Sequence, residues 1–463
     1  MENINIHLAD EEAIYVITRT GQRELLNLNK ITDRLQKLAR RHPKINHINA
    51  YELMLKVGTG LKSEITTYEI DEYTANAAAS MSITNPYYMK LASRIIIDNH
   101  QKITLGNFLD KMKLAYFRKD HSGIISPLLS KEFFNYVEDN HNTIQKFIDY
   151  DRDFLLDFFG FKTFLSIYSL KIDKKPIERP QDMFMRTAIA LHMHTKIISK
   201  HENNIEYNTD EELVMIKNTY DSLSKLQYSQ ASPTYFNAGT KKTQYSSCFL
   251  LGSDDDTNKI MDTAKEMANI SKWGGGIGIH AHNIRGSGSL IRGTNGYSNG
   301  IVPFLQIYNS TIRAFNQGGK REGAAAVYLM LHHPDIETFL KLRLPNGSEE
   351  NRARSLFYAV WIPDLFMERV RDGKMWSLFD PNKTYDLSNL YDEICKEDDK
   401  SGKRYTNKYL DMEEKKMYSR QLPAREIWEL IYNANKVTGM PYICCDRRFR
   451  FTKIHYISIS QIR

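Results

Sequence analysis

The spacing of apolar and polar residues changes along the chain, and each part predicts a different kind of structure. In residues 15–24, YVITRTGQRE, an apolar run leads to Gly21 and a polar run follows, which predicts a small hairpin that turns at Gly21. ITDRLQKLARR then carries apolar residues at helical spacing, and TANAAASMS and YYMKLASRIIIDN predict two more helices. We expect these elements to form one small domain over residues 14–105.

Residues 106–230 are predicted to be mainly helical and rich in aromatic side chains. RPQDMFMRTAIALHMH and DEELVMIKNTYDSLSKL are two of the helical patterns. A run that starts at Tyr150, YDRDFLLDFFGFKTF, holds many of the aromatic residues. Such residues form a packed core more often than a cofactor cage, so we expect a helical region with an aromatic core.

From residue 231 to 442, short apolar runs alternate with helical patterns. SSCFLLG, at 246–252, and AAAVYLML, at 324–331, predict buried strands. The helical patterns between and after them are NKIMDTAKEMANISK, IVPFLQIYNSTIRAF and HPDIETFLKL. This alternation predicts an α/β fold with a parallel sheet or barrel, whose ligands bind at the carboxyl ends of the strands. The charged segment 391–404 is expected to be a surface insertion.

The end of the sequence departs from this pattern. PAREIWELIYNANKVTG predicts a helix capped by Gly439. After MPY, residues 443–463 show neither the alternation of a strand nor the turn residues of a continuing barrel. We therefore expect an unmatched tail over residues 443–463.

Composition indicates a globular protein. The 463 residues exceed one ordinary core and favour two or three domains. Apolar residues make up 41%, charged residues 26%, and the net charge is +7. That mild charge suits phosphate-bearing ligands or an ordinary surface, but no dense Lys/Arg block predicts nucleic acid as a partner. No run of about 18 apolar residues occurs, so no membrane span is expected.

The number and spacing of the cysteines indicate the redox compartment and exclude one kind of metal site. The four cysteines, Cys248, Cys395, Cys444 and Cys445, include no CxxC pair. A structural zinc site is therefore not expected. So few cysteines in so long a chain favour free thiols in a reducing compartment. MENINIHLADEEA lacks the apolar core of a secretory signal, and we expect a cytoplasmic protein.

Cys248 is the first candidate for chemistry. A cysteine at the start of a buried strand is most often a small packing residue, but it acts as a redox thiol where it is exposed to a pocket. Ser232, Thr234 and Ser247 offer hydroxyl groups near such a pocket. Serine and threonine cap turns more often than they bind ligands, so these three are weak candidates alone.

Glycine-rich segments are the second candidate. Residues 272–278, KWGGGIG, lead to Arg285 and then to RGTNGYSNG at 292–300. Glycine allows backbone N–H groups to approach phosphate, and Lys272 and Arg285 could neutralise it. The pattern is neither a Walker loop nor a dinucleotide fingerprint, so phosphate binding and tight turns remain equally open. NQGGKREG, at 316–323, joins flexible glycines to two cations and could sense a ligand.

These motifs, in this order, resemble the large subunits of class I ribonucleotide reductases over residues 15–442. The resemblance rests on YDRDF with FGFKT, RPQDMFMR, ASPTYFNAGT, SSCFLL, ISKWGGGIG, IRGSGSLIRGTNGYSNGIVP, NQGGKREGA, RARSLFYAVWIPDLFMERV and TGMPY. It implies an N-terminal ATP cone and helical region, followed by the first half of a ten-stranded α/β barrel. It also implies reduction of ribonucleoside diphosphates at the 2′ carbon by thiyl-radical chemistry, for deoxyribonucleotide synthesis and DNA replication.

The resemblance assigns roles to particular residues. Cys248 matches one of two reducing cysteines, and Ser232 and Ser247 match substrate-binding positions, with Thr234 nearby. The implied specificity-effector residues are Asp255 or Asp256, Lys272, Arg285, Arg292 and Gly293. The implied loop that carries effector identity to substrate choice includes Asn316, Gln317, Lys320 and Arg321; many relatives have aspartate where Asn316 stands. The implied ATP residues of the cone are Arg19, Glu24, Lys30, Thr67 and Asp71, while Thr18 replaces a common lysine.

The resemblance also implies ligands and partners. ATP or deoxynucleoside triphosphates would act as effectors, and this subunit would need no metal. An external dithiol reductant of the thioredoxin or glutaredoxin type would restore the cysteines. The partners would be a ribonucleotide reductase small subunit and a second copy of the chain, with residues 258–272 as a dimer contact.

The family pattern continues beyond TGMPY to an Asn-x-Cys-x-Glu segment that this sequence does not contain. We therefore expect the chain alone to lack reductase activity, and an open half-barrel to be poorly soluble. The alternative is a catalytically inactive nucleotide-binding fragment, which a ribonucleotide reduction assay with a small subunit distinguishes. An ATP-cone repressor is disfavoured because such proteins carry a zinc ribbon, and paired CxxC motifs do not occur here.

Overall fold

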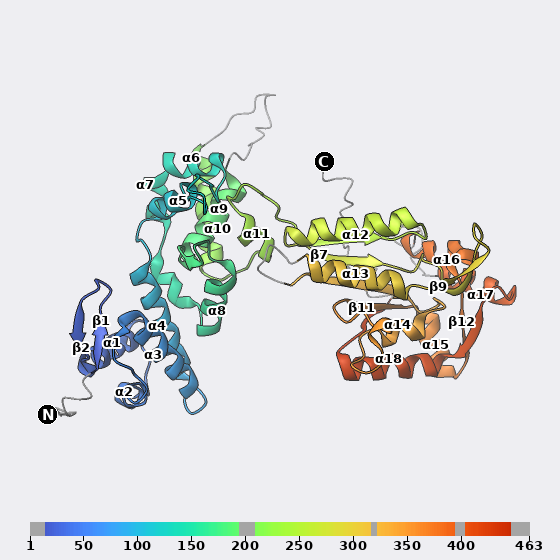
Figure 1. The fold of residues 1–463 in the computed structure, drawn as a ribbon, viewed down its shortest axis with the longest axis horizontal. Coiled ribbons are helices and arrows are strands. Elements are labelled where there is room, and N and C mark those ends of the chain that lie inside the picture. The colour runs from blue at the N-terminus through green and yellow to red at the C-terminus, as the bar shows by residue number, and fades with distance from the viewer. Residues whose placement is uncertain (1–13, 194–208, 316–321, 394–402, 446–463) are drawn as a thin grey trace. The chain divides into compact units, whose positions relative to one another are not determined.

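The computed structural model describes residues 14–193, 209–315, 322–393 and 403–445. These residues fall into two compact units, residues 1–245 and residues 246–463, and each unit is considered by itself (Figure 1). No described helix is both long enough and apolar enough to cross a membrane.

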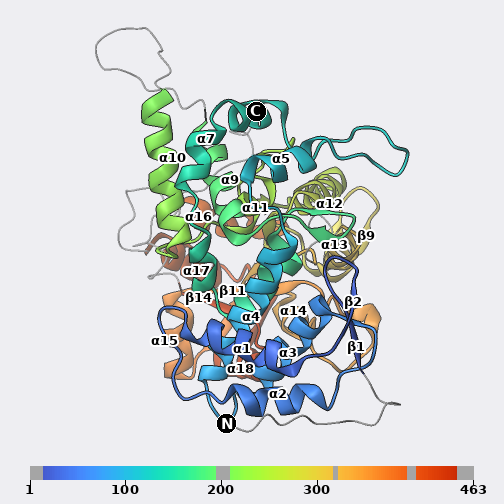
Figure 2. The same ribbon diagram turned by 90° about the vertical axis from the view of Figure 1, so that its left-hand side faces the viewer.

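The first unit begins with a three-stranded sheet and four helices. β1 pairs antiparallel with β2 and parallel with β3, so the hairpin expected over 15–24 is confirmed, and Gly21 has the positive φ of 82° that its turn requires. Figure 2 shows α1, α2 and α3 gathered at one end of α4. The elements are β1 (Tyr15–Ile17), β2 (Arg23–Leu25), α1 (Leu28–Arg40), α2 (Ala50–Gly58), β3 (Ile65–Thr66), α3 (Thr67–Met81) and α4 (Tyr87–Ile103).

The rest of the first unit is helical, as predicted. Phe158, Phe161 and Phe164 are buried, so these members of the aromatic run are core packing, whereas Phe159 is exposed. The helix α4 packs against both α1 and α8 and so belongs to both parts of the unit. The elements are α5 (Phe108–Tyr116), α6 (Lys131–Asp139), α7 (His141–Phe147), η2 (Tyr150–Leu155), α8 (Phe158–Thr163), η3 (Phe164–Tyr168), β4 (Lys171–Ile172), β5 (Lys175–Pro176), α9 (Pro180–His192), α10 (Thr209–Ser224) and α11 (Ser232–Asn237).

The second unit is built on a five-stranded parallel sheet, as the alternating pattern predicts. The strand order is β14-β11-β10-β7-β6. Its strands are β6 (Cys248–Gly252), β7 (Gly276–His280), β10 (Ala325–Met330), β11 (Phe357–Ile362) and β14 (Tyr442–Cys445). Two antiparallel pairs lie outside this sheet: β8 (Ser287–Ile291) with β9 (Gly296–Asn299), and β12 (Met375–Leu378) with β13 (Arg420–Pro423).

Helices connect the parallel strands. Figure 1 shows α12 and α13 side by side, and α14, α15 and α18 grouped together. Gly439 caps α18 with a φ of 72°, as expected from the sequence. The helices are α12 (Thr257–Lys272), α13 (Val302–Ala314), α14 (Ile336–Lys341), η4 (Glu349–Asn351), α15 (Asp364–Asp372), α16 (Pro381–Glu393), α17 (Lys403–Glu414) and α18 (Ala424–Thr438).

The two faces of the parallel sheet differ in burial. Ile277, Ile279 and Val327 are buried in the core shared with the helices. Residues at alternate positions, such as Gly278 and Tyr328, are only partly buried. Because side chains alternate along a strand, one face of the sheet is covered by helices and the other is left more open. We call the second face the open face.

Two expectations about the strands are wrong. SSCFLLG was expected to be a buried strand, but Leu250 is 44% exposed, because β6 is the terminal strand of the described sheet and pairs only with β7. Residues 443–445 were assigned to an unmatched tail, but they lie in β14, which pairs with β11. These residues form a strand because they pair with β11, and not because their own sequence shows the alternation of a strand. Residues 446–463, and 394–402 of the expected surface insertion, lie outside the described residues.

Candidate functional site

The small domain expected over residues 14–105, which we call the cone, brings two of its predicted nucleotide-binding residues into direct contact. Arg19 Nη2 donates to Asp71 Oδ2 at 2.7 Å. The Asp71 side chain is 5% exposed and the Arg19 side chain 30%. The carboxylate is therefore withdrawn from water, and it holds the arginine at the surface of the domain.

Three further polar residues complete this cluster, and the sequence did not indicate them. Arg34 bridges the two acids with one hydrogen bond to Asp71 and two to Asp98, and Arg19 also donates to Asn99 Oδ1 at 2.6 Å. The cations Arg34 and Lys102 hold the pKa of Asp98 below its usual value, against the opposing effect of burial, which is the largest single influence. Arg34, Asp98 and Asn99 lie on α1 and α4, so only the fold brings them to Arg19.

The other predicted cone residues lie on neighbouring elements. Lys30 Nζ is 3.3 Å from Glu24 Oε2, which joins the start of α1 to β2. Thr67 is the first residue of α3, directly after Thr66, whose hydroxyl caps the helix. A helix N-terminus favours negative charge, which suits a phosphate near Thr67. The cone thus offers cations and a helix start, as a nucleoside triphosphate requires.

Cys248 lies at the start of β6, and its thiol is exposed. In the register of the sheet it pairs with Gly276, while Leu250 pairs with Gly278, so Cys248 is on the open face. The hydroxyl of Ser247 is 3.5 Å from its sulfur. The sulfur is therefore accessible rather than a packing atom.

Cys444 and Cys445 are far from this thiol within the sheet. They lie on β14 at the opposite edge, with β7, β10 and β11 between. Strands are spaced by about 4.8 Å, so the edge strands are separated by roughly 19 Å. A disulfide needs Cα atoms within about 7 Å, so neither residue can bond to Cys248 in this sheet. Burial raises the pKa of Cys444 to about 11, which makes its thiol a poor nucleophile.

Ser232 and Thr234 lie on α11 of the first unit. The Ser232 hydroxyl is 2.8 Å from Tyr168 Oη, and Thr234 Oγ1 donates to the carbonyl of Tyr245 at 3.4 Å. Asn237 Nδ2 donates to the carbonyl of Gln244 at 2.7 Å. The helix α11 thus holds the segment that ends, in sequence, three residues before Cys248.

The first glycine-rich segment is used for packing. The amides of Gly274, Gly275 and Gly276 donate to the carbonyls of Ser271, Ile270 and Ser247. A Cβ atom at Gly275 would lie 2.5 Å from Ile270 Cγ2 and 2.7 Å from the Phe249 ring. Glycine at these positions therefore allows a tight turn and close contact between α12 and the sheet, which favours the tight-turn interpretation over phosphate binding.

Asp255 and Arg285 are the predicted effector residues that the structure brings together. Arg285 Nε donates to Asp255 Oδ2 at 2.6 Å, just beyond the carboxyl ends of β6 and β7. Arg285 Nη1 also donates to the carbonyl of Leu290, two residues before the exposed Arg292 and Gly293. Asp256 has a structural contact instead, because its carboxylate caps α12 through the amides of residues 258 and 259.

Lys272 is separated from this acid–arginine pair. It is the last residue of α12, whereas Asp255 and Asp256 precede the helix. Sixteen residues of α-helix span about 24 Å. Within one chain, Lys272 and Arg285 therefore do not converge on one phosphate group. Asn316, Gln317, Lys320 and Arg321 of the second glycine loop lie outside the described residues.

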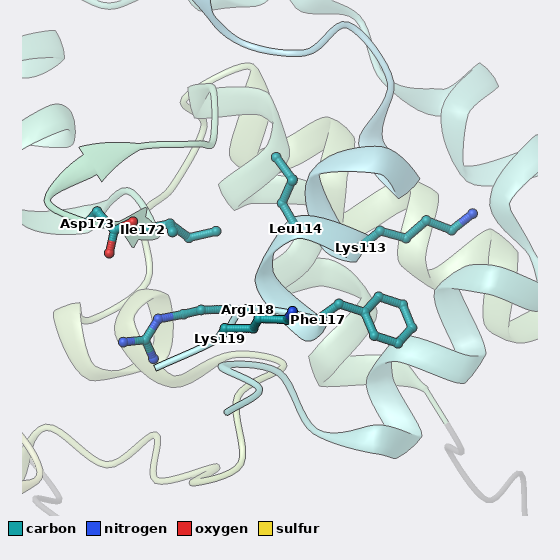
Figure 3. A pocket seen from close by; sticks show the side chains of 7 residues that line it. All are labelled: Lys113, Leu114, Phe117, Arg118, Lys119, Ile172 and Asp173. Atoms are coloured by element: carbon teal, nitrogen blue, oxygen red, sulfur yellow. The ribbon is translucent and has the colours of Figure 1, made fainter. Parts of the chain in front are cut away.

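A surface hollow of about 530 Å³ lies between α5 and the β4–β5 hairpin (Figure 3). Its lining residues are Lys113, Leu114, Phe117, Arg118, Lys119, Ile172 and Asp173. Figure 3 shows the side chains of Lys113 and Arg118 pointing in opposite directions, so these cations do not converge on one ligand. No predicted site residue lines this hollow. Among the described residues, no group of three or more His, Cys, Asp or Glu side chains is arranged to hold a metal ion.

Comparison with known families matches three parts of the chain. The model of the ATP cone domain matches residues 14–103. The model of the ribonucleotide reductase all-alpha domain matches residues 154–243, and that of the ribonucleotide reductase barrel domain matches residues 246–450. The last match includes β14.

Curated relatives that match the chain are named as large subunits of ribonucleoside-diphosphate reductase. The ribonucleoside-diphosphate reductase large subunit of Arabidopsis thaliana is 40% identical over 456 residues, which cover 97% of this chain and 52% of the relative. The corresponding subunit of Dictyostelium discoideum is 40% identical, over 99% of this chain and 51% of its own length. That of Variola virus is 40% identical, over 97% of this chain and 56% of its own length.

The chain spans about half the length of the curated relatives it matches. The matched domains follow one another in the order that the sequence motifs predict. From these matches together, the chain belongs to the ribonucleotide reductase large-subunit family.

Proposed function

We propose that the protein to which this chain belongs is the catalytic and allosteric large subunit of a ribonucleoside-diphosphate reductase. Cys248 is one of the two thiols that reduce the substrate. Oxidation of two thiols to one disulfide yields two electrons and two protons, so the 2′ hydroxyl leaves as water and hydrogen takes its place. An external dithiol then reduces the disulfide and restores the enzyme.

The observation that carries this proposal is the exposure of Cys248 on the open face of the sheet. A reducing thiol must reach the substrate carbon and must afterwards be accessible to a second dithiol. Positions packed under the helices, such as Ile277, Ile279 and Val327, satisfy neither requirement, because they are buried. Ser247 places a hydroxyl group beside the sulfur, where it can donate to a bound diphosphate.

Two regulatory nucleotide sites belong to the proposal. ATP or a deoxynucleoside triphosphate binds the cone through Arg19, Glu24, Lys30, Thr67 and Asp71. A specificity effector binds near Asp255 and Arg285. Loop 316–323 links the identity of the bound effector to the choice of substrate. Separate domains carry these sites, so the two effectors can act independently.

The position of Lys272 supports a homodimer. Since α12 separates Lys272 from Asp255 and Arg285 by about 24 Å, a single copy cannot use all three residues on one triphosphate. A twofold arrangement of antiparallel α12 helices places Lys272 of a second copy beside the acid–arginine pair. We therefore propose that the effector binds between two copies, and that a small subunit is the further partner.

The test is reduction of a ribonucleoside diphosphate by the protein with a small subunit and dithiothreitol, measured as deoxynucleotide formed. We expect Cys248→Ser to abolish product formation. Cys445→Ser is the matched control, because Cys445 is also exposed and lies on the opposite edge strand. Equal loss of product in both variants, or full activity of Cys248→Ser, would contradict the role of Cys248.

A further inference from the structure

A fully buried ion pair lies at the centre of the helical region, and the functional assignments leave it without a role. Arg186 Nε donates to Glu178 Oε1 at 2.6 Å, and Arg186 Nη2 donates to Glu178 Oε2 at 3.1 Å. Both side chains are 0% exposed. Arg186 closes the RPQDMFMR motif, and Glu178 stands directly before that motif.

The other end of this guanidinium contacts the predicted substrate segment. Arg186 Nη1 donates to the carbonyl of Tyr235 at 3.1 Å and to that of Ala238 at 2.7 Å. These carbonyls lie at the end of α11, where a short helix leaves its C=O groups without helical partners. One side chain therefore satisfies the end of the helix that carries Ser232 and Thr234.

Glu178 is itself fixed from two sides. Its Oε2 accepts from the amide of Leu170 at 2.9 Å, and its carbonyl lies 2.8 Å from His100 Nε2 on α4. The backbone of Glu178 is thus tied to α4, and its carboxylate is tied to the chain just before β4. The planar guanidinium of Arg186 bonds to Glu178 at one edge and to α11 at the other, so fixing Glu178 also fixes α11.

The pair has no simple explanation as a source of stability. Removing two charges from water costs free energy that an ion pair recovers only with good geometry, so buried pairs often stabilise no more than apolar residues would. Here the hydrogen bonds that Arg186 makes outside the pair lead to one place, the carbonyls of Tyr235 and Ala238 at the end of α11. The helix in turn holds Gln244 and Tyr245 through Asn237 and Thr234.

We propose that Arg186, held by Glu178, is a positioning residue for substrate binding. It sets the orientation of α11, and through α11 the course of residues 232–245, so that the hydroxyl group of Ser232 is held ready for the ribonucleoside diphosphate while Thr234 fixes the segment that follows. This role rests on the proposed function of the protein. Arg186 itself does not contact the substrate.

The test compares two conservative variants with a control at another buried ion pair. Arg186→Lys keeps the charge but lacks the planar fork that reaches both Glu178 and the two carbonyls. Glu178→Gln keeps the shape and removes the charge. Lys111→Met breaks the equally buried Lys111–Asp182 pair, in which neither partner bonds to α11.

Two measurements are made on the full chain at a temperature where all variants are folded. Amide hydrogen exchange reports the rigidity of residues 232–245, and equilibrium dialysis with cytidine diphosphate reports substrate affinity. We expect both Arg186→Lys and Glu178→Gln to raise exchange in that segment and to weaken binding about tenfold, as the loss of a charged hydrogen bond implies. Lys111→Met should change neither quantity.

The measurements separate failure of this inference from failure of the proposed function. Wild-type exchange in both variants, or equal loosening of residues 232–245 in Lys111→Met, overturns the positioning role. Loosened exchange with wild-type affinity shows a merely structural contact and also overturns it. If the wild-type chain binds no cytidine diphosphate, the proposed function is contradicted, and the exchange measurement still decides whether Arg186 holds the segment.

Discussion

Arg19 and Asp71 are 52 residues apart in sequence, and a 2.7 Å hydrogen bond joins them in the cone. Arg34 binds the other oxygen of the same carboxylate. One buried acid thus holds two guanidinium groups, with Arg19 the more exposed of the two. A polyphosphate near Arg19 would meet a cation whose position is already fixed, so less conformational entropy is lost on binding.

The first prediction concerns Arg34 in this cluster. Arg34→Gln removes the charged partner that Asp71 shares with Asp98, and so loosens the carboxylate that holds Arg19. We expect ATP affinity to fall about tenfold or more, since hydrogen bonds to charged groups contribute about 1.5–3 kcal/mol. Isothermal titration calorimetry on the full chain measures this. Arg41→Gln, at an ion pair with the exposed Asp151, is the control and should bind ATP normally. Normal affinity in Arg34→Gln would contradict the cluster's role.

The second prediction concerns the acid–arginine pair. Arg285→Gln should weaken binding of a deoxynucleoside triphosphate by about tenfold or more, because the variant lacks the guanidinium, which binds phosphate through charged hydrogen bonds. ATP binding by the cone should not change. Arg354→Gln serves as the comparison, because Arg354 pairs with the exposed Glu349 in the same unit. If both variants bind the effector equally well, the site lies elsewhere.

The third prediction concerns the close contact at Gly275. Gly275→Ala places a Cβ atom against Ile270 and Phe249, so the second unit should lose about 1–3 kcal/mol of stability. All four tryptophans are in this unit, so urea unfolding followed by tryptophan fluorescence reports it alone. Gly293→Ala meets nothing within 4 Å and should leave the unfolding midpoint unchanged. Equal midpoints for both variants would argue against tight packing at Gly275.

The fourth prediction concerns buried histidines of the second unit. Burial lowers the pKa of His282 well below 6.5 and that of His332 to about 3, with the neighbouring His333 adding to both shifts and His280 adding to that of His282. A lowered folded-state pKa stabilises the fold above the unfolded value of 6.5, and this contribution is lost as pH falls toward 3.

At pH 5 each such histidine should therefore cost about 2 kcal/mol relative to neutral pH. Urea unfolding between pH 7 and pH 5, followed by tryptophan fluorescence, measures the loss. His282→Leu removes one of these groups and should make the decline shallower by about that amount. The same slope in the variant and in the wild type would show that His282 does not titrate in this range.

The sequence was sufficient to predict elements whose signals are local. The hairpin at Gly21 and the helix that ends at Gly439 follow from turn and capping preferences, and both are confirmed. The strand β7 was not predicted, because GIGIH lies inside a glycine-rich run that also fits a loop. Its signal is the alternation of Ile277 and Ile279 with smaller residues, which becomes visible once one face is known to be buried.

Tertiary contacts explain what the sequence did not show. Arg34, Asp98 and Asn99 have no motif of their own, and they meet Arg19 and Asp71 only because α1 and α4 pack together. Lys272 is the opposite case. Its sequence neighbourhood fits a phosphate site, but the length of α12 separates it from Arg285. Strand β14 was missed because pairing with β11, not local alternation, makes it a strand.

The central claim is that a ribonucleoside diphosphate binds beside an accessible thiol at Cys248, and thiol alkylation tests it most directly. Iodoacetamide should modify Cys248 and Cys445, the two cysteines that are exposed among the described residues, and peptide mass spectrometry measures each rate. We predict that cytidine diphosphate slows modification of Cys248 at least severalfold and leaves Cys445 unchanged. Equal rates at Cys248 with and without the nucleotide, at saturating concentration, would contradict the account.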